Sequence, residues 1–96
     1  MKFILIGTHA PEWVGRSRER TPRASAKARE LGIVVTANYF TQGQYDFVSV
    51  LDCPDPASAS AFSIWYMEQG FGRVQTMLAY DSQEFGAVLD KVDAKS

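Results

Sequence analysis

Apolar residues of this chain cluster in four short runs that are rich in β-branched and aromatic side chains, a composition typical of β-strands. We therefore predict strands over residues 2–8, 33–41, 45–51 and 73–80. The segment between the first two strands has the spacing of a helix. Thr21 is a good cap for a helix that starts at Pro22 and stops at Gly32, because proline is tolerated at the first helical position and glycine favours the end.

Two further helices are marked by their own caps. Asp55, followed by a proline, predicts a helix over residues 56–70. Asp81, with Glu84 three residues later, has the pattern of a capping box and predicts a last helix that ends at about Val92. The elements therefore follow the order β-α-β-β-α-β, with one more helix at the C-terminus.

This order is that of a ferredoxin-like sandwich, an α+β fold with an antiparallel sheet in the strand order 4-1-3-2 and both main helices on one face. The second and third strands form a hairpin that turns at Gln42 and Gly43. The chain has 96 residues, so we expect residues 1–96 to form a single domain. A core of this size is small, and oligomerisation is a common way to enlarge it.

The predicted strands are apolar on both faces. Phe3 and Leu5 point to one face, whereas Ile4 and Ile6 point to the other. The other strands show the same feature: Val35 and Tyr39 oppose Val34 and Phe40, and Tyr45 and Phe47 oppose Val48 and Val50. Two helices can cover only one face of the sheet. We therefore expect a second copy of the chain to cover the other, giving a homodimer in the manner of a dimeric α+β barrel, with a higher oligomer left open.

The charge balance argues against polyanionic partners. The formal net charge is −1, which provides no general attraction to nucleic acid or to an anionic membrane. Basic residues crowd between positions 16 and 29, where a phosphate backbone could meet Arg16, Arg18, Arg20 and Arg23. No aromatic residues are interleaved with them, so a solvated surface is the simpler interpretation. We expect no nucleic-acid partner.

Neither membrane insertion nor export is indicated. The N-terminal apolar run, residues 3–6, is too short for a membrane span or a signal-peptide core. Cys53 is the only cysteine, so no disulfide can form within the chain, and we expect a reducing compartment, the cytoplasm. Cys53 and His9 fall at opposite ends of the predicted sheet and no metal-binding spacing is present, so we expect neither a metal nor a cofactor.

The predicted topology brings chemically able side chains to one rim of the sheet. The end of the first strand lies beside the starts of the third and fourth strands. The residues that gather there are His9, Tyr45, Asp46 and Arg73, and Trp13 can fold over them. Such a group could bind a small anionic or aromatic molecule. His9 could then transfer a proton, and Asp46 could orient the His9 imidazole. The alternative is structural: Asp46 caps the hairpin turn and Arg73 satisfies its charge.

A second candidate site lies between the helix of residues 56–70 and the sheet. Phe62, Trp65 and Tyr66 on this helix are typical of core residues that pack against a sheet. A pocket left beside them would be the natural place for an apolar ligand, with Trp65 as a ligand-binding candidate.

The hairpin also carries a family signature. Residues 43–48, Gly-Gln-Tyr-Asp-Phe-Val, resemble the GYD domain family, small proteins named for a Gly, a Tyr and an Asp at this place. Supporting matches are the helix of residues 22–32, the segment 72–76 that enters the last strand, and the Glu84-Phe85 pair after it. The resemblance implies a dimeric α+β barrel, a group that includes cofactor-independent monooxygenases, isomerases and ligand-sensing modules. GYD members mostly lack an assigned activity, so the resemblance supports the fold and the dimer more than any chemistry.

Two functional hypotheses follow. The first is a homodimeric module without an assigned reaction that binds a small anionic or aromatic molecule. The second is a cofactor-independent enzyme, a monooxygenase or an isomerase acting on a small aromatic substrate, with His9, Tyr45 and Asp46 as catalytic candidates and Trp13, Trp65 and Arg73 as ligand contacts.

Overall fold

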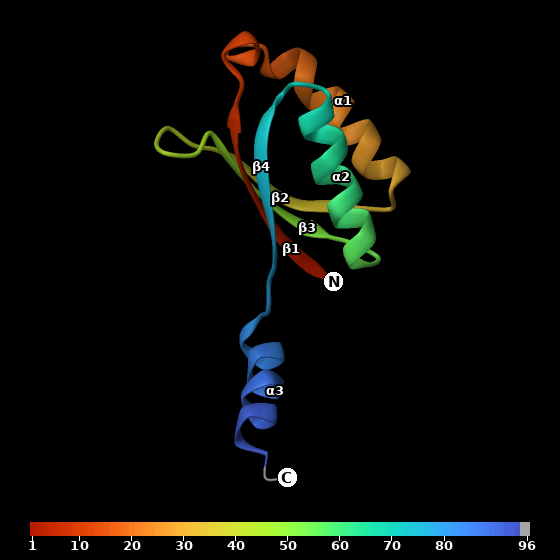
Figure 1. Ribbon diagram of the computed structural model, residues 1–96, viewed down its shortest axis with the longest axis vertical. Helices are drawn as coiled ribbons and strands as arrows, with labels where there is room; N and C mark the ends of the chain where they lie inside the picture. Colours follow the sequence, from red (N-terminus) through yellow and green to blue (C-terminus); the bar gives the residue numbers. More distant parts are fainter. Residues whose placement is uncertain (95–96) are drawn as a thin grey trace.

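The computed structural model describes residues 1–94 and has the α+β architecture that the sequence predicts (Figure 1). One sheet contains four antiparallel strands in the order β2-β3-β1-β4, which confirms the ferredoxin-like topology. Helices α1 and α2 lie on the same side of this sheet (Figure 1). In chain order the elements are β1 (Lys2–His9), the short 3-10 helix η1 (Pro11–Trp13), α1 (Ser17–Glu30), β2 (Val34–Phe40), β3 (Phe47–Asp52), α2 (Pro56–Glu68), β4 (Gly72–Leu78) and α3 (Ser82–Asp93).

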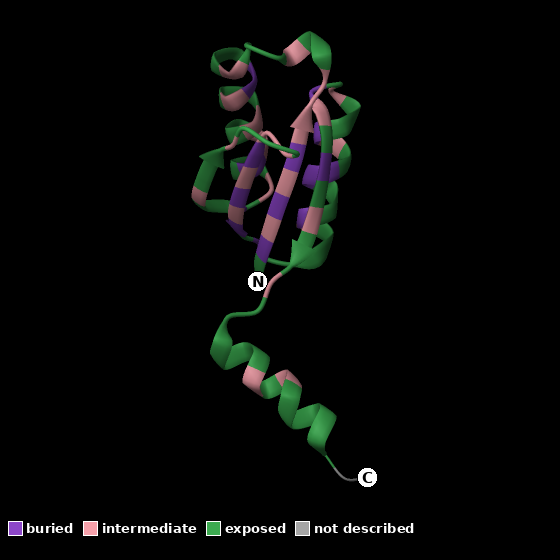
Figure 2. Ribbon diagram, turned by 90° about the vertical axis from the view of Figure 1, so that its left-hand side faces the viewer, coloured by how far each residue is buried: buried purple, intermediate pink, exposed green. Residues whose placement is uncertain are grey.

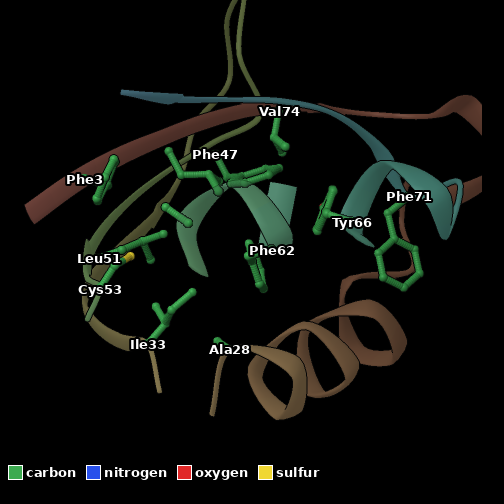
Figure 3. Packing of buried hydrophobic residues seen from close by; sticks show 12 residues of the cluster. Phe3, Ala28, Ile33, Phe47, Leu51, Cys53, Phe62, Tyr66, Phe71 and Val74 are labelled. Carbon is green, nitrogen blue, oxygen red and sulfur yellow. The ribbon is translucent and has the colours of Figure 1, made fainter. Parts of the chain in front are cut away.

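The core fills the space between the sheet and helices α1 and α2. Aromatic rings dominate one end, where Phe71 is completely buried and meets the ring of Tyr66 edge to face, with ring centres 5.2 Å apart. At the other end lie Ile33, Leu51 and Cys53 (Figure 3). Burying one large apolar side chain contributes about 1.5–3 kcal/mol, so the aromatic end of the core fixes α2 and the segment after it on the sheet.

Helix α1 begins at Ser17, earlier than the predicted start at Pro22. The proline lies inside the helix, where it removes one backbone hydrogen bond, and the predicted cap one residue before it is wrong. The first turn is held instead by Arg16, whose guanidinium donates to both carboxylate oxygens of Glu19 at 2.9 Å. An acidic side chain in the first turn also stabilises the helix through its dipole. The additional turn brings Arg20 into the body of the protein, where it is buried.

Strand β2 contains a bulge, seen as a shift in register between Val35 and Ala37. Before the bulge Val35 lies opposite the buried Leu51, and after it Tyr39 lies opposite Val48. Directly opposite residues of antiparallel strands share a face. Val35 and Tyr39 therefore lie on different faces, contrary to the prediction, because a bulge inserts an unpaired residue and shifts the alternation.

The link between β2 and β3 is longer than the predicted tight turn. It spans residues 41–46, so Tyr45 and Asp46 lie in a loop and not in the strand. Thr41 closes this loop: its N–H donates to the carbonyl of Asp46 at 2.8 Å, and its hydroxyl donates to the carbonyl of Tyr45 at 2.6 Å. The N–H of Asp46 donates to the carbonyl of Gly7 at 2.8 Å, which fixes the loop against β1.

The centre of the sheet face opposite α1 and α2 is mostly apolar, and no element of residues 1–94 covers it (Figure 2). The pairing of the strands places Ile4 beside Val50 and Met77 on this face, and Ile6 beside Val48 and the polar Gln75. Buried and partly exposed residues alternate along the central strands in Figure 2, as expected when one side of a strand meets a core and the other does not. We refer to this surface as the open face.

Both predicted acidic helix caps are confirmed. The carboxylate of Asp55 accepts the N–H of Ser58 at 2.7 Å at the start of α2. At the start of α3, Asp81 accepts the N–H of Glu84 at 2.7 Å, and the Glu84 carboxylate accepts the N–H of Asp81 at 2.9 Å. This reciprocal pair is a complete capping box, so α3 forms where the sequence places it.

Helix α3 projects away from the rest of the domain (Figures 1 and 2). None of its residues is buried, although the apolar side chains of Phe85, Val88, Leu89 and Val92 follow the spacing of one helix face. The radius of gyration is 15.3 Å, larger than the value of about 12 Å expected for a compact domain of this length. Within residues 1–94, no helix is long and apolar enough to cross a membrane.

Gly72 is required by the close approach of β4 to β1. It pairs with His9, its φ is 154°, and a Cβ at this position would lie 1.9 Å from the carbonyl oxygen of Thr8. We predict that Gly72→Ala lowers the free energy of unfolding by about 2–4 kcal/mol. The measurement is the urea midpoint, followed by circular dichroism.

Gly43→Ala is the matched control, since a Cβ at Gly43 meets no atom within 4 Å and its φ is not positive. We expect this variant to change the free energy of unfolding by less than about 0.5 kcal/mol. Equal urea midpoints for the two variants would contradict the tight β1–β4 contact.

Candidate ligand-binding site

A cavity of about 200 Å³ lies between α1, α2 and the sheet. Most of its wall is apolar: Ala28 comes from α1, Phe62 from α2, and Leu51 from β3 (Figure 3). Ala24 of α1 also lines it. The half-exposed side chain of Val35 on the edge strand β2 also lines it, on the solvent side. The sheet and the helices thus enclose a space that their own side chains do not fill.

Arg20 brings a positive charge into the wall of this cavity. It is 3% exposed, and no carboxylate of residues 1–94 lies within ion-pair distance of it. One guanidinium nitrogen, Nη2, donates to the hydroxyl of Ser17 at 3.2 Å, whereas Nη1 has no hydrogen-bond partner. A buried guanidinium without a counter-ion is costly, so this group is suited to an anion from outside the chain.

Tyr66 places a hydroxyl on the same cavity from α2. The residue is 3% exposed, and its hydroxyl has no hydrogen-bond partner within the described chain. Burial raises the pKa of Tyr66, the positive charge of Arg20 opposes that rise, and the charge of Asp46 adds to it. The phenol is therefore neutral at physiological pH and can donate a hydrogen bond.

His9, the last residue of β1, supplies the third polar atom of this group. Its imidazole stacks on the ring of Phe47 with ring centres 5.5 Å apart, and its Nε2 is buried without a partner. Burial lowers the pKa of His9 from its ordinary value of 6.5; the charge of Arg20 lowers it further and Asp46 opposes. The imidazole is therefore neutral at pH 7.

These three atoms are the buried side-chain nitrogen and oxygen atoms of residues 1–94 that lack a partner, and they form one group. The charge of Arg20 acts on both His9 and Tyr66, and Phe47 contacts both rings. Arg20 on α1 and Tyr66 on α2 therefore bring unsatisfied polar groups to the lining of the cavity, whereas His9 on β1 lies outside that lining. Buried polar atoms are almost always hydrogen-bonded, which makes this group the strongest candidate for a binding site.

The sequence matches a known protein family. The model of the GYD domain matches residues 3–89, nearly the whole chain. The chain belongs to the GYD domain family. No curated protein matches it.

The GYD signature residues lie at the rim predicted from the topology. The carboxylate of Asp46 accepts the backbone N–H of His9 at 2.7 Å, which ties the β2–β3 loop to the end of β1. Arg73 lies opposite Thr8 on β4, next to the same rim. Tyr45 directs its carbonyl to Thr41 in the loop. The structure thus brings all four rim candidates to one end of the sheet.

The contacts at this rim of the GYD domain differ from the predicted ones. Asp46 bonds to the backbone of His9 and not to the imidazole that it was expected to orient. No ion pair joins Asp46 to Arg73 in the part of the chain described, so the structural alternative in which Arg73 satisfies Asp46 is wrong. Arg73 and His9 instead line an open pocket of about 380 Å³ together with Thr8 and Gly72.

The two tryptophans named as ligand contacts pack against other side chains. Trp13 meets Phe71 edge to face at 4.6 Å between ring centres, and the guanidinium of Arg16 lies 3.9 Å from its ring centre. Trp65 packs on Phe62 and Phe71 with ring centres 6.0 and 5.8 Å apart. Neither tryptophan is among the cavity-lining residues. Both belong to the aromatic end of the core.

Arg20 and Tyr66 are not among the site residues predicted from the sequence. Arg20 was one arginine in a basic stretch placed before the predicted helix. The signal that could have found it is its spacing with Ala24 and Ala28, four and eight residues on, which puts all three on one face of a helix that continues back through Pro22. Tyr66 was predicted to be a core residue. Its ring does lie in the core, but its hydroxyl is buried without a hydrogen-bond partner, which the prediction did not include.

Cys53 has no part in this site. It is buried near the opposite end of the sheet, where its N–H donates to the carbonyl of Met1 at 2.7 Å. Burial raises the pKa of its thiol, which disfavours the reactive thiolate. Within residues 1–94, no three His, Cys, Asp or Glu side chains come together in a way that could hold a metal ion.

The electrostatic coupling around Arg20 can be measured through His9, the single histidine of the chain. Arg20→Met removes a positive charge, so we predict that the pKa of His9 rises toward 6.5. Asp46→Asn removes a negative charge and should lower the pKa of His9. The readout is an NMR titration of the imidazole Cε1–H resonance.

The wild-type pKa also has a consequence for stability. Because the unfolded chain binds a proton at His9 at a higher pH than the native state does, this residue destabilises the fold as the pH falls below 6.5. A His9 pKa that Arg20→Met leaves unchanged would contradict the proximity of the two groups.

Proposed function

We propose that this GYD domain is a homodimeric module that binds a small anionic or aromatic molecule in the cavity between α1, α2 and the sheet. The observation that carries the proposal is the pair of unsatisfied, buried polar groups of Arg20 and Tyr66 in the lining of a mostly apolar cavity, with the unpartnered Nε2 of His9 on the neighbouring strand β1. A protein that needed only a stable core would gain by replacing the buried guanidinium with an apolar side chain. Keeping it there is best explained by a ligand.

The size of the cavity supports a small ligand. An apolar cavity of about 150 Å³ holds a benzene molecule, and typical drug-sized sites begin at about 300 Å³. The observed volume, about 200 Å³, lies between these values. A molecule built around one ring, or an aliphatic one of similar size, would fill it.

The open face supports the homodimer. Ile4, Ile6, Val48 and Val50 form a continuous apolar surface there, and large exposed apolar patches mark interaction sites. A two-fold axis through this surface would pair it with itself and bury both copies at once. The apolar stripe of α3 is a second surface that the described residues, 1–94, leave unburied, and a second subunit could bury it too. The buried Cys53 supports the expected reducing compartment, the cytoplasm.

A cofactor-independent enzyme, a monooxygenase or an isomerase, is the second candidate. The observation that favours it is the neutral, unpartnered Nε2 of His9, which could accept a proton from a bound substrate. His9 also lines a separate, open pocket of about 380 Å³, which is large enough for a small substrate. Against the enzyme, the carboxylate of Asp46 is engaged by a backbone N–H, and His9 does not line the cavity between the helices and the sheet. A bound molecule that wild-type protein alters and that His9→Gln leaves unaltered would favour the enzyme.

The dimer can be tested at the centre of the open face. Val48→Asp should give monomers or insoluble protein, because the dimer would bury a carboxylate without a partner. Ser60→Asp, at an exposed position on α2, is the control and should keep the wild-type size. Sedimentation velocity measures both, and a soluble dimer of Val48→Asp with wild-type affinity would refute the interface.

The cavity can be tested independently of charge by filling it. Ala24 lines the cavity, whereas Ala26 on the same helix is exposed and does not. We expect single-ring fragments to bind the wild type and Ala26→Phe in ligand-observed NMR, and expect Ala24→Phe to lose binding at least tenfold. Native mass spectrometry of the freshly purified wild type and of the same two variants tests whether each protein retains a bound molecule. Equal binding by both variants, or no binding to the wild type, would overturn the site.

A further inference from the structure

We infer that the molecule bound in this cavity is a monocarboxylate of about single-ring size, whose carboxylate is held by Arg20 and the hydroxyl of Tyr66. This inference rests on the ligand site proposed above and assigns its chemical class.

The single positive charge of the site favours a ligand that carries one negative charge. Arg20 is the one charged residue among the described residues that line the cavity. Its guanidinium is buried and has no carboxylate in ion-pair range, and Asp46, whose charge influences its neighbours, already accepts the N–H of His9. One uncompensated buried cation is neutralised by one anion.

The donors of the site match the two oxygens of a carboxylate. Nη1 of Arg20 and the hydroxyl of Tyr66 are both buried, both lack a partner and both can donate. A guanidinium and a neutral phenol together satisfy a carboxylate with charge-assisted hydrogen bonds. A phosphate monoester carries a charge of about −1.5 to −2 and a third acceptor oxygen. It would leave excess negative charge buried in a site that has one cation.

The rest of the cavity suits an apolar body. Leu51, Phe47 and Phe62 are buried residues of its wall. Among the neutral polar residues of the wall, the hydroxyl of Ser49 donates to the side-chain oxygen of Asn38 at 2.6 Å. Within residues 1–94, no second charged residue lines the cavity to anchor a dicarboxylate or a zwitterion, and the volume of about 200 Å³ accommodates one ring.

The test compares benzoate with its neutral isostere benzamide by isothermal titration calorimetry at pH 7.5. We expect wild-type protein to bind benzoate at least tenfold more tightly than benzamide. Arg20→Met should bring this ratio close to one, and Tyr66→Phe should weaken benzoate binding about three- to tenfold while sparing benzamide. Arg18→Met, which changes an exposed arginine of the same helix, should keep the wild-type ratio.

Folding of the variants is checked by thermal unfolding without ligand. Because Arg20→Met removes an uncompensated buried charge, we expect its melting temperature to equal or exceed that of the wild type. Tyr66→Phe keeps the shape of the ring and tests the same anchor if Arg20→Met does not fold.

The outcomes separate the two levels of the proposal. Equal binding of benzoate and benzamide to the wild type would overturn the acid class while leaving the ligand cavity intact. A preference for benzoate that survives in both Arg20→Met and Tyr66→Phe would overturn the assigned anchor. Failure of benzoate, benzamide and the neutral fragments to bind the wild type would overturn the ligand site itself.

Discussion

Four antiparallel strands carry apolar side chains on both faces, while α1 and α2 cover only one of them. This mismatch governs the rest of the molecule. On the helix side, aromatic rings around Phe71 hold α2 to the sheet, and the space under α1 is left partly unfilled as a cavity. On the other side, no element of residues 1–94 covers Ile4, Ile6, Val48 and Val50. In the function that we propose, a second copy covers the open face and a small molecule fills the cavity on the helix side.

The position of α1 decides the chemistry of the cavity. Because the helix continues through Pro22, Arg20 falls on the same helical face as Ala24 and Ala28 and is buried against the sheet. Its charge lowers the pKa of His9 and limits the rise in the pKa of Tyr66. A single helical turn thus converts an apolar gap in a small core into a site with a defined charge.

The fold could be predicted from the sequence because its signals are local. The helix caps predicted at Asp55 and Asp81 are present in the structure. The order of strands and helices along the chain was sufficient to predict the strand order of the ferredoxin-like sheet. The start of α1 was missed because Pro22 resembles a first helical residue, and only burial of the preceding turn overrides that preference. The bulge in β2 is set by pairing with β3, which no pattern within residues 34–40 reveals.

The candidate site was predictable only in part for the same reason. The strand order placed His9, Asp46 and Arg73 at one rim, as the structure has them. The hydrogen bonds among them depend on side-chain directions that topology does not determine, and Asp46 accepts a backbone N–H where a bond to the imidazole was expected. Arg20 and Tyr66 meet only after α1 and α2 have packed on the sheet.

The central claim is that the open face is buried by a second copy of the same chain. An isotope-filtered NOESY spectrum of a mixture of ¹³C-labelled and unlabelled wild-type protein tests it most directly, because it detects only contacts between chains. We predict interchain contacts among the methyl groups of Ile6, Val48 and Val50. A spectrum without them, from protein that sediments as a monomer, would contradict the claim.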